Sequence, residues 1–134
     1  MNITIKAKLI TLLPKLLKLG MVRYGKLLEQ FPEAKTRSAV LVLYDDQGNR
    51  IAFWGGFEDD NLVFREVDPR NPPPCTTMIE MHVNTFIAIL KGELDFRTAY
   101  IHDLIDIKSF DGLPASYHLL IWAAFFDKAV ELLK

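Results

Sequence analysis

The side chains of this chain that could carry chemistry are few and lie far apart in the sequence. Its three histidines are His82, His102 and His118, and Cys75 is its single cysteine. No histidine stands at metal-ligand spacing from another histidine or from the cysteine. We therefore expect no metal site and no disulfide within the chain, and we expect Cys75 to be an inert or exposed thiol.

One segment has the composition of an acid–base cluster: His102-Asp103, with Asp106 three residues further along. An imidazole and two carboxylates could transfer a proton. A turn at this place explains the same three polar residues more simply, because polar side chains are common in turns. The sequence therefore favours a protein that is not an enzyme, with a small enzyme as the least favoured alternative.

Two further patterns do not meet the requirements of a ligand site. The aspartate pairs at 45–46 and 59–60 lack the additional oxygen ligands and the spacing of a calcium loop. Gly55-Gly56 lies inside strand-like sequence, whereas a phosphate-binding loop precedes a helix. The two glycines indicate a bulge or a close approach of the backbone instead. We expect no cofactor.

Charge is distributed unevenly along the chain, although its net charge is only −1. Residues 1–31 carry six lysines or arginines and one acidic residue, whereas the other 103 residues carry ten basic and sixteen acidic ones. A near-neutral chain is not expected to bind nucleic acid. The length suits one hydrophobic core, so we expect a single domain over residues 1–134.

Hydrophobic periodicity predicts a helical segment followed by strands. Within an N-terminal segment 1–33, residues 5–31 repeat apolar side chains at three- and four-residue steps, which predicts an amphipathic helix weakened at Pro14. Three strands are predicted at 39–44, 50–57 and 62–67, the first of them covered on both faces, with a turn at 45–49.

The proline-rich loop 68–74 leads to an alternating strand at 76–83. Alternation places Ile79, Met81 and Val83 on one face of this strand and Met78, Glu80 and His82 on the other.

Two short helices and a fifth strand are predicted next. Asn84 is a favourable N-cap for a helix at 85–91, and Gly92 fits the position just after its end. Asp95 is expected to cap a second helix at 96–101. A strand at 104–108 and a turn at 109–112 lead to a final helix, whose residues 117–126 are apolar almost all round and must be buried on more than one side.

Residues 76–126 follow a specific pattern. Its segments are Leu90-Lys-Gly-Glu-Leu-Asp95, Arg97-Thr-Ala-Tyr100, Ile105-Asp-Ile-Lys108 and Gly112. This pattern resembles the sterol carrier protein 2 (SCP2) family of lipid-binding domains. Two positions depart from it, because the family usually has glycine where this chain has Asp103 and Ser109.

The resemblance implies an α/β (α+β) fold: a five-stranded, mostly antiparallel sheet with helices on one face and an apolar tunnel between them. Such a tunnel would bind fatty acids, acyl-CoA, sterols or other lipids without a cofactor and without catalysis. An ordinary core uses the same residue types, so the sequence leaves open whether the tunnel is open or filled. The candidate tunnel residues are Ile79, Met81, Phe86, Ile89, Leu90, Tyr100, Ile101, Ile105, Ile107, Ile121, Trp122, Phe125 and Phe126.

The basic side chains beside the leucine stripe of residues 5–31 suit the surface of an anionic membrane. The alternative is that this stripe packs on the sheet and the basic groups are merely solvated. A cytoplasmic location is expected, because the N-terminal segment does not read as a signal peptide. The candidate membrane contacts are Lys8, Lys15, Lys18, Arg23 and Lys26.

Two interpretations of the function come ahead of the small enzyme. The leading one is a non-catalytic carrier of a hydrophobic ligand, which would enter near the final helix and the turn at Gly112. The alternative is an accessory subunit that presents an apolar intermediate, for example a prenylated quinone precursor, to biosynthetic enzymes. In that case Ile121, Trp122 and Phe125 could instead form a homodimer seam.

Overall fold

The computed structural model describes residues 36–58 and 61–114, which form a five-stranded sheet and two helices. In chain order these are β1 (Ser38–Tyr44), β2 (Arg50–Glu58), β3 (Asn61–Val67), β4 (Thr77–His82), α2 (Val83–Leu90), α3 (Phe96–Ile101) and β5 (Ile105–Ser109). The strands and short helices predicted within this part of the chain are confirmed, with small shifts at their ends. The helices predicted at 5–31 and 117–126 lie outside the described residues.

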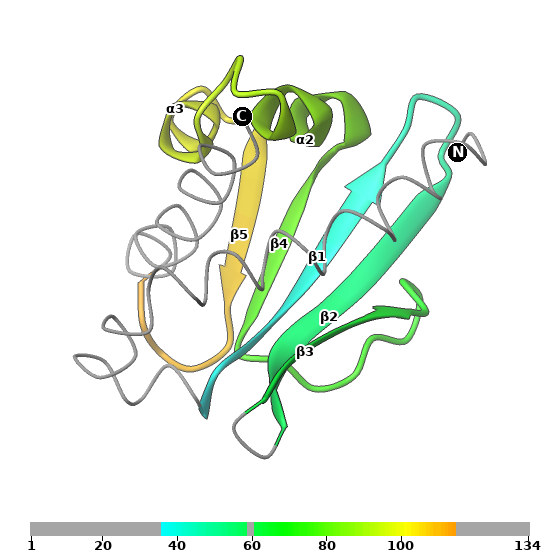
Figure 1. The fold of residues 1–134 in the computed structure, drawn as a ribbon, viewed down its shortest axis with the longest axis vertical. Helices are drawn as coiled ribbons and strands as arrows, with labels where there is room; N and C mark the ends of the chain where they lie inside the picture. Colours follow the sequence, from blue (N-terminus) through cyan, green and yellow to red (C-terminus); the bar gives the residue numbers. More distant parts are fainter. Residues whose placement is uncertain (1–35, 59–60, 115–134) are drawn as a thin grey trace.

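The strand order across the sheet is β3-β2-β1-β4-β5 (Figure 1). The central strand β1 pairs antiparallel with β2 and parallel with β4, while β2–β3 and β4–β5 are antiparallel. A parallel pair needs a long connection, and β2, β3 and the loop before β4 provide it. The prediction of a mostly antiparallel sheet is confirmed.

Each face of the sheet has its own apolar cluster. On the face that we call inner, buried strand residues pack with α2 and α3, which lie together at one end of the sheet (Figure 1). On the outer face, Val40, Val42 and Ala52 form a smaller cluster against which Trp54 and Cys75 pack. The central strand β1 is therefore covered on both faces, as its continuous apolar run predicts.

The turn after β1 is built by Asp45. Its carboxylate accepts hydrogen bonds from the backbone N–H groups of Gln47 and Asn49, both at 2.9 Å. Gly48 completes the turn at φ +81°, a conformation that glycine adopts without strain. The turn predicted at 45–49 is confirmed, and it directs β2 back along β1.

The strand β4 runs into α2 without a loop, and this changes the helix cap. The N-cap is His82, and the prediction of Asn84 is wrong: the imidazole Nδ1 accepts a hydrogen bond from the backbone N–H of Asn84 at 3.0 Å. Because the helix begins at Val83, the capping position falls on the last strand residue. The N-cap of α3 is Asp95, as predicted.

Both helices end in the same hydrogen-bond arrangement, the Schellman motif. After α2, the N–H groups of Gly92 and Glu93 donate to the carbonyl oxygens of Ile89 and Ala88, both at 3.0 Å. After α3, the N–H of Asp103 donates to the Tyr100 oxygen at 3.1 Å, and the N–H of Leu104 to the Ala99 oxygen at 2.9 Å. Each motif ends its helix and turns the chain into the following segment.

Candidate functional site

The inner face of the sheet carries two parallel rows of buried apolar side chains. The strand registers align one residue from each of β2, β1, β4 and β5 in each row. The rows are Phe53-Leu41-Ile79-Ile107 and Ile51-Leu43-Met81-Ile105, all of them buried. Together they form a continuous apolar surface across four strands.

The helices complete this surface at one end. Val83, Phe86 and Ile89 of α2 and Phe96 and Ala99 of α3 are buried against the two rows. Phe96 and Ala99 reach it because Asp95 fixes the start of α3, accepting hydrogen bonds from the backbone N–H and the hydroxyl of Thr98 at 2.7 and 2.8 Å. We call these five residues and the eight row residues the inner cluster.

Beyond the two rows, on the side away from α2 and α3, the inner face continues with small side chains. The register aligns Gly55, Ala39, Thr77 and Ser109 in this third row. Among the residues that the structure describes, Thr77 is the buried polar one. This third row therefore has smaller side chains than the two rows beside it.

Most of the described candidate tunnel residues come together on the inner face. Ile79, Met81, Phe86, Ile89, Ile105 and Ile107 belong to the inner cluster, and Leu90 and Tyr100 are partly buried against it. Four of them lie on β4 and β5, where alternation alone assigned the face correctly.

The prediction that Ile101 lines the tunnel is wrong, because this residue does not belong to the inner cluster. Its exposed fraction is 74%. In α3 the residues that face the sheet are Phe96 and Ala99, and a residue five positions after Phe96 points about 140° away from it around a helix. Ile101 therefore points to the outside at the end of this helix.

The remaining candidates lie outside the described residues. They are the apolar residues Ile121, Trp122, Phe125 and Phe126 and the basic residues Lys8, Lys15, Lys18, Arg23 and Lys26.

Seven residues of the inner cluster were not among the sequence-based candidates. Leu41, Leu43, Ile51 and Phe53 lie on β1 and β2, and Val83, Phe96 and Ala99 lie on the helices. The continuous apolar run of β1 hid which of its side chains face the helices. Strand register is the information that assigns them, and the periodicity of one segment does not contain it.

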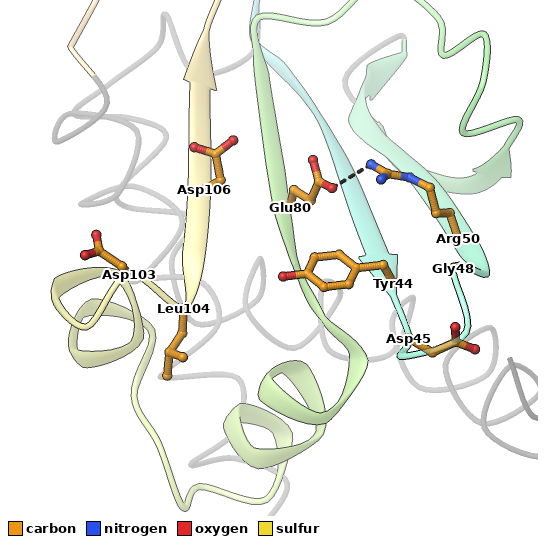
Figure 2. Close-up of a pocket in the computed structure, with 8 residues that line it drawn as sticks. All are labelled: Tyr44, Asp45, Gly48, Arg50, Glu80, Asp103, Leu104 and Asp106. Carbon is orange, nitrogen blue, oxygen red and sulfur yellow. Dashed lines mark hydrogen bonds and ion pairs between the residues drawn. The ribbon is translucent and has the colours of Figure 1, made fainter.

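A cavity of about 400 Å³ lies on the outer face, and most of the residues that line it are charged. Tyr44, Arg50, Glu80 and Asp106 reach it from four different strands, and an ion pair of 2.6 Å joins Arg50 to Glu80 (Figure 2). The rest of its lining is Asp45, Gly48, Asp103 and Leu104. Four of the lining residues carry carboxylates, and burying a charged group against an acyl chain or a sterol is costly. This cavity is therefore distinct from the apolar surface of the inner cluster.

The structure brings together only two of the three residues of the acid–base cluster that the sequence suggested. Asp103 and Asp106 line the outer cavity, whereas His102 does not and is exposed at the end of α3. The pKa of Asp45, also in the lining, is held well below its ordinary value, chiefly by the hydrogen bond from the Asn49 side chain. Asp45 is thus occupied as a turn-forming carboxylate.

Cys75 is half-buried against the outer cluster, and burial raises the pKa of its thiol. A raised thiol pKa means less thiolate near neutral pH, as expected of an inert cysteine. Among residues 36–58 and 61–114, no group of three histidine, cysteine or acidic side chains is placed to hold a metal ion. Within the same ranges, no helix has the length and hydropathy needed to cross a bilayer.

No protein-family model and no curated protein matches this chain. Its likeness is to solved structures. Sterol carrier protein 2 from Yarrowia lipolytica, in its apo form, matches with a TM-score of 0.53 at 11% identity, over 77% of this chain and 72% of that one. Sterol carrier protein domain 2 of Helicoverpa armigera matches with a TM-score of 0.51 at 12% identity, over 81% and 89%.

Sterol Carrier Protein 2 Like 2 from Aedes aegypti matches with a TM-score of 0.50 at 11% identity, over 84% of this chain and 93% of that one. Identities this low define the fold. The chain has the SCP2-like α+β fold, as its sequence pattern predicted.

Proposed function

We propose that this protein binds a hydrophobic ligand, such as a fatty acyl chain or a sterol, between the inner face of its sheet and its helices. The observation that carries the proposal is the inner cluster, which spans four strands and both described helices. The SCP2-like fold supports it, because the solved structures with this fold include proteins named as sterol carriers. The protein would act as a carrier, without catalysis.

The chemistry of the inner face suits such a ligand. Each unpaired polar group buried against an alkyl chain costs about 1–3 kcal/mol, and the two rows of the sheet present none. Each methylene that leaves water contributes about 0.8 kcal/mol. An apolar chain lying along these rows would therefore gain affinity from shape and burial alone.

The row of small side chains indicates where a guest would find room. Ala39 lies in the middle of this row, beside Leu41 of the same strand face, and is buried. A larger residue at this position would extend into the space that we assign to the ligand. Ala52 is also a buried alanine, on the outer face, and provides a comparison.

The experiment is a fluorescence titration of the delipidated protein with a fluorescent fatty acid, together with Ala39→Leu and Ala52→Leu. The proposal predicts binding by the unchanged protein, a loss of at least tenfold in affinity for Ala39→Leu, and unchanged affinity for Ala52→Leu. Loss of binding in both variants, or in neither, would contradict an inner-face site.

We further propose that the basic residues of segment 1–31, including Lys8, Lys15 and Lys18, bring the carrier to anionic membranes. The support is the sequence pattern of basic side chains beside a leucine stripe. Vesicle co-sedimentation should show binding to anionic vesicles that falls as salt rises. Equal retention on neutral and anionic vesicles would contradict this part of the proposal.

A second candidate function is an accessory subunit for enzymes that act on an apolar intermediate. The observation that favours it is the exposure of Ile101 and Leu104, two large apolar residues that flank the turn between α3 and β5. Affinity purification of the tagged chain would test it, with Ile101→Ser as the comparison. A stable enzyme complex that Ile101→Ser abolishes would favour this role over the free carrier.

A further inference from the structure

His82 connects three parts of the fold through one imidazole ring. Its Nε2 lies 2.9 Å from Asp46 Oδ1 in the turn between β1 and β2. Its Nδ1 accepts the N–H of Asn84 and so caps α2. Its ring meets the ring of Tyr44, at the end of β1, edge to face with centroids 5.5 Å apart.

These contacts define one protonation state. Because Nδ1 accepts a hydrogen bond, it carries no proton, so the proton of the neutral ring is on Nε2 and is donated to Asp46. Adding a proton at Nδ1 would place two donors, the ring N–H and the Asn84 N–H, against each other. The helix cap and the protonated imidazole are therefore mutually exclusive.

The surrounding charges give the protonated ring no substitute partner on α2. The first turn of α2 contains no acidic residue, and the positive end of a helix dipole disfavours a cation. On β4 the nearest carboxylate on the same face is Glu80, which already pairs with Arg50. Among the described residues, the carboxylate in direct contact with the ring is that of Asp46, whose side chain is 89% exposed.

On the β5 side, Asp103 and Asp106 line the outer cavity together with Tyr44. They contribute a diffuse negative potential and no hydrogen bond to the ring. Protonation thus keeps the link from His82 to the turn and removes its link to α2.

We propose that His82 is a pH-sensitive cap, which holds the first turn of α2 when the imidazole is neutral and releases it when the imidazole is protonated. Acidification favours the protonated ring and therefore the release. The released turn carries Val83 and leads to Phe86, which are both buried in the inner cluster. Acidification therefore loosens the wall of this cluster at one end.

Hydrogen exchange of the ligand-free protein, corrected for the intrinsic effect of pH on exchange, tests the proposal. Between pH 7.5 and 5.5 the amides in the first turn of α2 should lose about fivefold in protection, the typical effect of losing an N-cap. His82→Asn should keep high protection at both pH values, because asparagine caps a helix without titrating. His102→Asn should behave like the unchanged protein, because His102 is exposed and lies at the end of α3.

A pH-independent first turn in the unchanged protein, or the same pH response in His82→Asn, would overturn the proposal. If His82→Asn fails to fold, nitrogen NMR of the His82 ring serves instead. The Asn84 amide resonance should then shift with the titration of the His82 ring, and an Asn84 resonance that does not follow it overturns the proposal. These measurements need no ligand, so their outcome is independent of whether the protein carries lipid.

Discussion

The indole ring of Trp54 lies so close to Gly56 on the outer face of β2 that any side chain at Gly56 would collide with it. A Cβ added at Gly56 would lie 2.7 Å from Trp54 Cη2 and 2.9 Å from Cζ2. The ring is held in place by a hydrogen bond of 3.2 Å from its Nε1 to the Pro74 oxygen and by the Arg65 guanidinium, 4.7 Å from a ring centroid. The ladder with β1 continues through both glycines, so the close approach is present without a bulge.

Gly56→Ala should therefore destabilise the protein, although glycine inside a strand is intrinsically unfavourable. We expect a loss of about 1–3 kcal/mol in the free energy of unfolding, the usual cost of overpacking. Urea denaturation measures it. Trp54→Phe removes the benzene part of the indole, which contains the two clashing atoms. In this background Gly56→Ala should cost little stability or even raise it. An equal cost in both backgrounds would contradict the steric explanation.

Among the residues that the structure describes, Asp103 is the non-glycine residue whose φ is positive, at +59°. It holds the position after α3 that Gly92, at φ +76°, holds after α2. Asp103→Gly should raise the free energy of unfolding by about 0.5–1 kcal/mol, because glycine adopts this conformation without strain. Asp103→Asn is the control, since it removes the charge and keeps a side chain, and a stabilisation of equal size in both variants would assign the effect to charge.

Asp95 contributes stability that depends on pH. The hydrogen bond from the Thr98 backbone N–H, and then that from the Thr98 hydroxyl, hold the pKa of Asp95 below its ordinary value of 3.8. A carboxyl with a lowered pKa stabilises the fold above its ordinary pKa and loses this effect as the pH falls through the lowered value.

At pH 7, Asp95→Ala should lose about 1 kcal/mol in the free energy of unfolding, the usual value of an N-cap, while Asp95→Asn should lose much less. Below pH 4, the difference between the unchanged protein and Asp95→Ala should shrink. Urea denaturation at pH 7 and pH 3 checks both points, and a difference that stays constant over this range would show that the charged carboxylate is not the stabilising group.

The sequence predicted much of this fold because its local patterns are strong. The alternation of β4, the cap at Asp95 and the glycine after α2 each depend on a few neighbouring residues and need no knowledge of the rest of the chain. Asp103 is a departure from the family pattern, which has glycine at this place, and the backbone takes a positive φ there nonetheless.

Features that depend on contacts between segments were harder to predict. The face to which Leu41 and Leu43 belong follows from the register of β1 against β2 and β4, which a continuous apolar run does not encode. The cap at His82 was missed because asparagine is the better intrinsic N-cap and the exact end of β4 was unknown. Ile101 was misplaced because α3 is only six residues long, so few of its residues can face the sheet.

The most direct test of the proposed function is native mass spectrometry of the protein purified without denaturant, followed by lipid extraction and mass analysis. We expect one apolar molecule per chain, and we expect Ala39→Leu to carry much less of it than Ala52→Leu. Three results together would contradict a ligand-binding interior. They are a native spectrum without bound lipid, no lipid bound after incubation with fatty acids and sterols, and a destabilisation by Ala39→Leu like that of any overpacked core substitution.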